Sequence, residues 1–191
     1  MGDTVQMRDA GQMMIHKYFV VGGRGYVGAA LYSSIPDGVA GYASTSSGAE
    51  GFLRLRLEVP GDFANLPISV GDVVFLTAAI SSPDICAREH DRAWAVNVTG
   101  TSGFIANVIT RGGRVVFFSS DTIYGERSDV FDETEKSNPA GEYAEMKAEV
   151  EKKFLGNPLF KSIRLSYVFS QEDKFTKYLS KETLQKSPRF C

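Results

Sequence analysis

Tyr143 and Lys147 form a Y-x-x-x-K pattern within a stretch, residues 140 to 155, that is predicted to be a helix. A spacing of four residues places the phenol and the ammonium on the same helix face. A tyrosine phenol ordinarily has a pKa of about 10, and a neighbouring ammonium favours the phenolate and lowers that pKa. Tyr143 could therefore exchange a proton with a substrate oxygen. A pair at this spacing is also common on helix surfaces by chance. Its interpretation as a catalytic pair therefore depends on the other motifs of the chain.

A second reactive stretch runs from Ser119 to Gly125 and reads Ser-Ser-Asp-Thr-Ile-Tyr-Gly. It follows the apolar run 114–119, which is predicted to be a strand. Open α/β sheets place their ligand crevice beyond the C-terminal ends of the strands. We therefore expect the hydroxyl of Ser120 at such a crevice.

A glycine loop with the spacing G-x-x-G-x-x-G is formed by Gly22, Gly25 and Gly28, between an apolar run and a run of small and apolar residues. Gly22 permits a sharp turn, Gly25 lets the backbone approach a pyrophosphate, and Gly28 lets the following helix pack close to the sheet. The N-terminus of that helix offers free N–H groups to phosphates. This order favours a dinucleotide site over a glycine turn without a ligand, and Tyr26 and Val27 inside the loop join the predicted cofactor contacts.

The end of the second predicted strand bears on the choice of cofactor. Sites for NAD usually carry an acidic residue there for the ribose diol, whereas this chain has Ser44 followed by further hydroxyl residues. Those hydroxyls, together with Arg24 in the glycine loop, suit a 2′-phosphate. The sequence thus favours NADP over NAD, and the alternative is that Arg24 is a solvated surface residue beside an ordinary loop.

Further cofactor contacts are expected after the third and fourth predicted strands. Ala78 and Ala79 are small enough to let a cofactor lie across a strand end. Asp62 and Phe63 could border an adenine, although a turn with one buried aromatic residue would show the same pattern.

The elements that must position these residues alternate between strand and helix. Apolar runs predict strands at residues 17–22, 39–44, 52–59, 72–77, 114–119 and 160–166, and helices are predicted at 25–34, 82–111 and 140–155. This alternation is typical of an α/β, Rossmann-type doubly wound parallel sheet with helices on both faces. The predicted organisation is an N-terminal extension at 1–16, a dinucleotide-binding domain at 17–170, and a tail or the start of a truncated substrate domain at 171–191.

Composition excludes several classes of function. Of 191 residues, 43% are hydrophobic and 23% charged, as in an ordinary globular protein, and the net charge of −2 gives no case for nucleic acid or an anionic membrane. Two cysteines and two histidines cannot build a disulfide framework or a metal-ligand cluster, so no metal is expected. Because we find neither a membrane span nor a signal peptide, we expect a cytoplasmic protein.

The joint order of these motifs resembles the extended branch of the short-chain dehydrogenase/reductase family, which comprises nucleotide-sugar epimerases, dehydratases and 4-keto reductases. The resemblance covers about residues 17 to 170. It rests on the glycine loop, Ala78-Ala79, the run Asn97-Val98-Thr99-Gly100-Thr101, the S-S-x-x-x-Y-G run at Ser119, the Tyr143/Lys147 pair and Arg164-Leu165-Ser166.

The resemblance implies a role for each residue of a catalytic set. Ser120 would hydrogen-bond the reacting oxygen, and Tyr143 would donate or accept the proton. Lys147 would hold the nicotinamide ribose and tune the tyrosine, whereas Asn97 is expected to be structural. The family also implies a nucleotide-sugar substrate and a homodimer paired through the 82–111 and 140–155 helices.

The resemblance also narrows the reaction. Dehydratases of this family use a glutamate where this chain has Thr122, and a hydroxyl cannot replace that base. The Ser120-Asp121 pair is similar to the dTDP-4-dehydrorhamnose reductase group, and an epimerase remains open. Members of the branch carry a substrate domain after the sixth strand, which here is expected to be truncated or absent. The alternative function is a non-catalytic NAD(P)-binding sensor or interaction protein.

Overall fold

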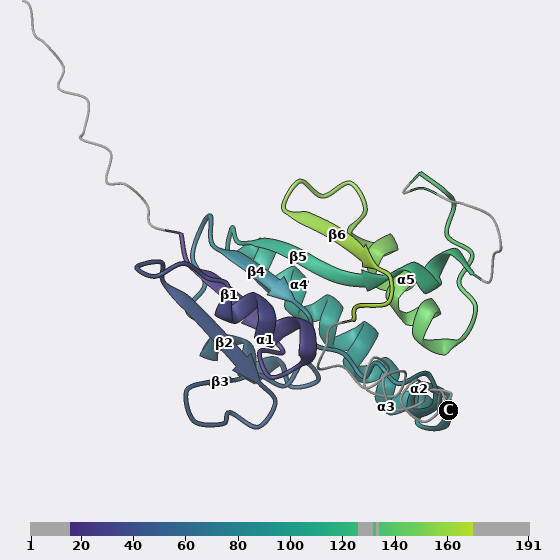
Figure 1. Ribbon diagram of the computed structural model, residues 1–191, viewed down its shortest axis with the longest axis horizontal. Helices are drawn as coiled ribbons and strands as arrows, with labels where there is room; N and C mark the ends of the chain where they lie inside the picture. Colours follow the sequence, from purple (N-terminus) through teal and green to yellow (C-terminus); the bar gives the residue numbers. More distant parts are fainter. Residues whose placement is uncertain (1–15, 126–131, 133, 170–191) are drawn as a thin grey trace, which may run out of the picture.

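Six parallel strands form one sheet in the computed structural model, which describes residues 16–125, 132 and 134–169 (Figure 1). The sheet order is β3-β2-β1-β4-β5-β6. Its strands are β1 (Tyr18–Val21), β2 (Gly41–Thr45), β3 (Leu53–Arg54), β4 (Val73–Leu76), β5 (Arg114–Ser120) and β6 (Phe160–Leu165). The predicted Rossmann-type fold is confirmed. Apart from His16, the predicted extension at 1–16 and the tail at 171–191 lie outside the described residues.

Strand β1 lies at the centre of the sheet and pairs with β2 on one side and β4 on the other. Val20 is in register with Ala43 of β2 and with Phe75 of β4. The chain therefore leaves β1 toward one edge of the sheet and later returns to build the opposite half. Ligands of open α/β sheets bind at this switch point, beyond the carboxyl ends of the strands.

The residues of β1 alternate between the two faces, as a strand buried on both sides requires. Phe19 and Val21 join the main core cluster with Phe104 and Val108. Val20, which lies between them, is equally buried at 1% exposure and points to the other face. Helix α1 (Tyr26–Ser33) covers that face at β1 and β2, whereas α4 (Thr101–Thr110) and α5 (Glu142–Phe154) cover the first.

One continuous helix was predicted from residue 82 to residue 111, and the structure divides it. Helix α2 (Pro83–Arg88) and helix α3 (His90–Trp94) are separated by Glu89, whose φ of −119° and ψ of 47° are not helical. A π-helical turn (Ala95–Gly100) then precedes α4. Ser82 caps α2, since its hydroxyl accepts a hydrogen bond from the Ile85 N–H.

The third predicted strand, 52–59, is mostly wrong, because β3 pairs only over Leu53–Arg54. Leu55 and Leu57 are each 4% exposed and belong to the main core. Their alternation with polar residues reflects an irregular segment that buries every second side chain. Sequence patterning cannot distinguish this arrangement from a strand. A 3₁₀ helix (Pro60–Asn65) follows and leads to β4.

The other predicted helices and strands agree with the structure to within about two residues at their ends. Among the described residues, no helix is both long and apolar enough to cross a lipid bilayer.

Candidate active site

The glycine loop forms a tight turn between β1 and α1. Gly22 has a φ of +91°, a conformation that other residues rarely adopt, and a Cβ on Gly22 would meet the Ala78 nitrogen at 2.9 Å. A Cβ on Gly28 would collide with the Gly22 carbonyl oxygen and would meet the Thr77 hydroxyl at 2.8 Å. The first and third glycines therefore have the steric roles predicted for them, since they bring α1 against the ends of β1 and β4.

The N-terminus of α1 opens onto the space above the sheet. Gly25 is its N-cap residue and has no side chain that could satisfy the N–H groups of the first turn. Its φ of −70° and ψ of 162° are extended, as is typical of an N-cap residue. Free N–H groups at a helix N-terminus attract phosphate through hydrogen bonds and the helix dipole.

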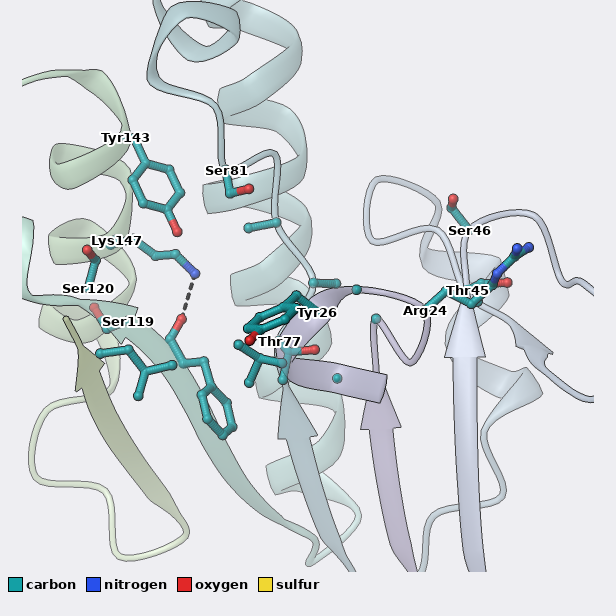
Figure 2. A pocket seen from close by; sticks show the side chains of 18 of the residues that line it. Arg24, Tyr26, Thr45, Ser46, Thr77, Ser81, Ser119, Ser120, Tyr143 and Lys147 are labelled. Carbon is teal, nitrogen blue, oxygen red and sulfur yellow. Dashed lines mark hydrogen bonds between the residues drawn. The ribbon is translucent and has the colours of Figure 1, made fainter. Parts of the chain in front are cut away.

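A pocket of about 510 Å³ extends from this helix end across the carboxyl ends of β1, β4 and β5 (Figure 2). Most of its lining consists of residues from the glycine loop, from the segments that follow β2 and β4, and from β5 and α5. The lining comprises Gly22, Arg24, Gly25, Tyr26, Val27, Gly28, Thr45, Ser46, Thr77, Ala78, Ala79, Ser81, Phe118, Ser119, Ser120, Tyr143, Lys147, Leu165 and Ser166. Eleven of the fourteen predicted site residues thus lie around one groove.

The two ends of the pocket have different chemistry. Figure 2 shows Arg24, Thr45 and Ser46 together at one end, and Tyr143 and Lys147 at the other, with Tyr26 between them. Arg24 and Ser46 are exposed, and Thr45 is half-buried. One end therefore offers a guanidinium with hydroxyls, which suits an anion, and the other offers groups that exchange protons.

Ser44 does not lie at the anion-binding end, which corrects the prediction from sequence. It is 2% exposed, and its carbonyl accepts hydrogen bonds from the Gly22 and Gly23 N–H groups at 3.1 Å and 3.0 Å. Ser44 therefore holds the glycine turn through its backbone. The side chains that reach the pocket belong to the next two residues, because β2 extends one residue beyond its predicted end.

Asp62 and Phe63 also lie away from the pocket, which corrects the expectation that they border an adenine. The Asp62 carboxylate accepts hydrogen bonds from Arg56 Nε at 2.7 Å and Arg56 Nη2 at 3.0 Å. These bonds lower the pKa of Asp62 to about 2. Phe63 packs edge-on against Phe104, with ring centroids 5.3 Å apart. Both residues therefore stabilise the fold. This agrees with the alternative interpretation of the segment as a turn with one buried aromatic residue.

Ser120 ends β5 and begins a 3₁₀ turn (Asp121–Tyr124). Its hydroxyl oxygen accepts hydrogen bonds from the Thr122 N–H at 3.3 Å and the Thr122 hydroxyl at 3.0 Å, and it lies 3.4 Å from Asp121 Oδ1. These contacts fix the hydroxyl at the rim of the pocket.

Helix α5 brings Tyr143 and Lys147 to the same pocket. Lys147 is 3% exposed, and its ammonium donates a hydrogen bond to the Phe118 carbonyl at 2.7 Å. The ammonium also lies 4.5 Å from the centre of the Phe117 ring and 5.6 Å from that of Tyr143. Burial lowers the pKa of Lys147 to about 8, while the Glu151 carboxylate acts in the opposite direction.

The acidity of Tyr143 differs from the prediction. Burial, with a smaller contribution from Cys86, raises the pKa of Tyr143 to about 12, whereas the nearby ammonium was expected to lower it. The Lys147 ammonium is directed at a backbone carbonyl on β5 and has itself a lowered pKa. Tyr143 therefore carries a firmly held proton in the protein alone.

Asn97 has the structural position expected of it. Its side-chain amide accepts a hydrogen bond from the Ile80 N–H at 2.8 Å and donates one to the Ile80 carbonyl at 2.9 Å. This pair of hydrogen bonds from the π-helical turn fixes the segment after β4, in which Ala78, Ala79 and Ser81 line the pocket.

Sequence reasoning did not assign part of the lining. Thr77 and Ser81 are polar residues that follow β4, Ser166 follows β6 in the same way, and the apolar Leu165 ends β6. Polarity beyond the carboxyl end of each parallel strand was the signal that could have found Thr77, Ser81 and Ser166. The described residues contain no group of three or more acidic, histidine or cysteine side chains that could hold a metal ion.

Residues 16–188 match the family model described as the RmlD substrate binding domain. No curated protein matches the chain. Among solved structures, it is similar to dTDP-4-dehydrorhamnose reductase from Bacillus anthracis in complex with NADP, with 19% identity and a TM-score of 0.76 over 91% of this chain. The corresponding reductase from Yersinia enterocolitica gives 22% identity and a TM-score of 0.76 over 90% of this chain.

A related enzyme with a different activity also has this fold. The UDP-glucose 4-epimerase of Thermotoga maritima, solved with UDP-glucose, matches 78% of this chain and 54% of its own, with 23% identity and a TM-score of 0.65. Likeness at these identities shows the fold. The matches cover 62% and 61% of the Bacillus and Yersinia reductases, so this chain spans less than two thirds of their length.

Proposed function

The chain belongs to the RmlD substrate binding domain family, and on that premise we propose that it is an NAD(P)-dependent oxidoreductase that reduces the keto group of a nucleotide sugar. The observation that carries the proposal is the single groove that joins the N-terminus of α1 to Ser120, Tyr143 and Lys147. One end has the chemistry of a phosphate site and the other has the chemistry of a proton donor.

The residues of the groove fit a dinucleotide. Gly25 places no side chain at the helix end, where a Cβ would also lie in tight contact with the Gly22 carbonyl oxygen, at 3.2 Å. The open N–H groups of the first turn of α1 suit a pyrophosphate. Arg24, Thr45 and Ser46 suit a 2′-phosphate, which favours NADP over NAD. The Bacillus anthracis reductase of the same fold was solved with NADP.

A bound reduced nicotinamide would supply a hydride to the carbonyl carbon of the sugar. Tyr143 would then donate its phenolic proton to the carbonyl oxygen, which balances the reduction to an alcohol. Ser120 would hydrogen-bond the same oxygen and orient it toward the phenol. Lys147, fixed on Phe118, would hold the ribose and supply positive charge near the phenolate left behind.

The protonation state of Tyr143 suits the proton donor of a reduction. A phenol with a pKa of about 12 keeps its proton at neutral pH and is ready to donate it. An epimerase must first oxidise its substrate, for which the same phenol would have to accept a proton. Thr122 argues against a dehydratase, because its hydroxyl cannot act as the base for water elimination.

Oxidation of NADPH in the presence of a 4-keto nucleotide sugar tests this proposal. We expect turnover in the wild type and a loss of about 10²–10⁴-fold in Tyr143→Phe, which cannot donate the proton. Tyr18→Phe is a matched control, since that tyrosine stacks on Phe75 in the sheet away from the pocket. Equal rates in wild type and Tyr143→Phe would refute the proposed mechanism. Cofactor binding without turnover of any 4-keto or 4-hydroxy nucleotide sugar would favour the sensor alternative.

We also propose that the protein is a homodimer in the cytoplasm, paired through the helical segment 82–111, which runs from α2 to α4, and through α5. Sedimentation at micromolar concentration tests this assembly, and a monomer under these conditions would refute it.

A further inference from the structure

Glu151 is a buried carboxylate on α5 that the proposed chemistry does not use. It lies one turn beyond Lys147 and two turns beyond Tyr143, so a spacing of four places the three side chains on one helix face. Glu151 is only 9% exposed. Because burial of an unpaired charge is costly, such a carboxylate needs partners.

Strand β6 supplies two partners of Glu151. Its carboxylate accepts hydrogen bonds from the Ser162 hydroxyl at 2.8 Å, Arg164 Nη2 at 2.8 Å and Arg164 Nε at 3.2 Å. Burial alone would raise the pKa of Glu151, but the hydrogen bonds, led by those of Arg164, lower it below the ordinary value. The carboxylate is therefore charged at neutral pH and ties α5 to β6.

Arg164 extends the connection to the segment that carries Ser120. Its Nη1 donates a hydrogen bond to the Tyr124 hydroxyl at 2.6 Å, and its guanidinium carbon lies 4.7 Å from the centre of the Tyr124 ring. Tyr124 ends the 3₁₀ turn that begins directly after Ser120. In the sheet, Arg164 is in register with Ser119, the residue before Ser120.

We propose that Glu151 is a positioning residue for the catalytic set, because its ion pair with Arg164 joins the helix that carries Tyr143 and Lys147 to the turn that carries Ser120. This inference rests on the proposed function, since only a reaction at the groove requires these two elements to hold a fixed separation.

The charge of Glu151 also affects the pKa of Lys147. Lys147 faces Tyr143 and Glu151 on its own helix, Cys86 from α2, and the Phe118 carbonyl from β5. Burial drives the pKa of Lys147 down, and the Glu151 carboxylate raises it again. Removal of the Glu151 charge should therefore make Lys147 lose its proton at a lower pH.

Glu151→Gln tests the proposal, because glutamine keeps the size and one acceptor oxygen but removes the charge. Glu149→Gln is the matched control: it lies on the same helix, where its carboxylate is 3.9 Å from Lys153 and outside the network. Tyr124→Phe is a second variant, which keeps the ring and removes the hydroxyl that accepts the hydrogen bond from Arg164. Two readouts need no cofactor: the NMR titration of the Lys147 ammonium, assigned with Lys147→Arg, and amide hydrogen exchange at residues 120–124.

We expect Glu151→Gln to lower the pKa of Lys147 by about one unit. Both Glu151→Gln and Tyr124→Phe should accelerate hydrogen exchange at residues 120–124, by about tenfold for each 1.4 kcal/mol lost. Glu149→Gln should match the wild type in both readouts. Unchanged exchange at 120–124 together with an unchanged pKa of Lys147 would overturn the inference, even if Glu151→Gln melts at a lower temperature. Failure of the wild type to bind NADPH would instead overturn the proposed function.

Discussion

The Lys147 ammonium donates a hydrogen bond of 2.7 Å to the Phe118 carbonyl, which holds α5 against the end of β5. The bond is made inside the protein, where Lys147 is 3% exposed. Tyr143 lies on the helix at one end of this connection, and Ser120 lies two residues beyond Phe118 on the strand at the other. The same burial that fixes the lysine lowers its pKa to about 8 and raises that of Tyr143 to about 12.

Lys147→Met removes a buried ammonium, which favours the variant near pH 7, but it leaves the Phe118 carbonyl without its donor at a cost of about 1–3 kcal/mol. The pH dependence separates the two effects, because only the first depends on protonation. The pKa of this lysine is about 8 in the folded protein, against 10.5 without the fold. Between these values the unfolded chain binds more protons, so the wild type gains stability as the pH rises. The stability of the variant relative to the wild type should therefore fall between pH 7 and about 9.5. Urea unfolding at both pH values measures it, and a constant difference would contradict the assignment.

Arg24→Ala should abolish a preference for NADPH over NADH of about tenfold or more, because the guanidinium is the cation at the end of the groove that suits a 2′-phosphate. Ser46→Ala should reduce the preference less. Ser44→Ala is the control and should leave it unchanged, since that hydroxyl is buried and does not line the pocket. Fluorescence titration with each cofactor gives the ratio. If the wild type binds both cofactors equally, the NADP assignment is wrong.

The sequence was sufficient for the fold class and for the residues of most of the groove. Three glycines between a strand and a helix, and Y-x-x-x-K after a strand that ends in serine, specify positions that the sheet must bring together. The sequence was insufficient where tertiary contacts decide the position or the pKa of a residue. From sequence, Ser44 and Thr45 are equally plausible pocket residues. Thr45 reaches the pocket because β2 pairs for one residue more than predicted. The raised pKa of Tyr143 depends on burial, which no spacing reveals.

Asp62→Asn should destabilise the fold without changing the affinity for NADPH by more than about twofold, because Arg56 and not a cofactor binds this carboxylate. The pKa of Asp62 is about 2, below its ordinary 3.8. Its stabilising effect is therefore complete above about pH 4 and is lost as the pH falls toward 2. The unfolding midpoints of wild type and variant should differ at pH 7 and converge in acid. A large loss of NADPH affinity would contradict this result and show that Asp62 contacts the cofactor.

Gly25→Asp distinguishes an effect on the stability of helix α1 from an effect on its proposed phosphate site. Gly25 is the N-cap residue, has extended backbone angles and makes no side-chain cap. Aspartate is a favoured cap, worth about a few tenths of a kcal/mol over glycine, but its Cβ would lie 3.2 Å from the Gly22 carbonyl oxygen. Because these two effects oppose each other, the variant should remain folded and unfold close to the wild type. Its carboxylate would occupy the N–H groups expected to bind the pyrophosphate and would repel it. Gly25→Asn is the matched control, because asparagine caps equally well without the charge.

Titration of NADPH into the wild type, Gly25→Asn and Gly25→Asp, followed by fluorescence, is the direct test of a dinucleotide site at the N-terminus of α1. We expect saturable binding to the wild type, weaker binding to Gly25→Asn, and binding to Gly25→Asp weaker than that of the asparagine variant by a further factor of about ten or more. Thermal unfolding of the same samples should show all three folded. Equal NADPH affinity in all three proteins, or no binding to the folded wild type, would contradict the assignment of the groove as a dinucleotide site.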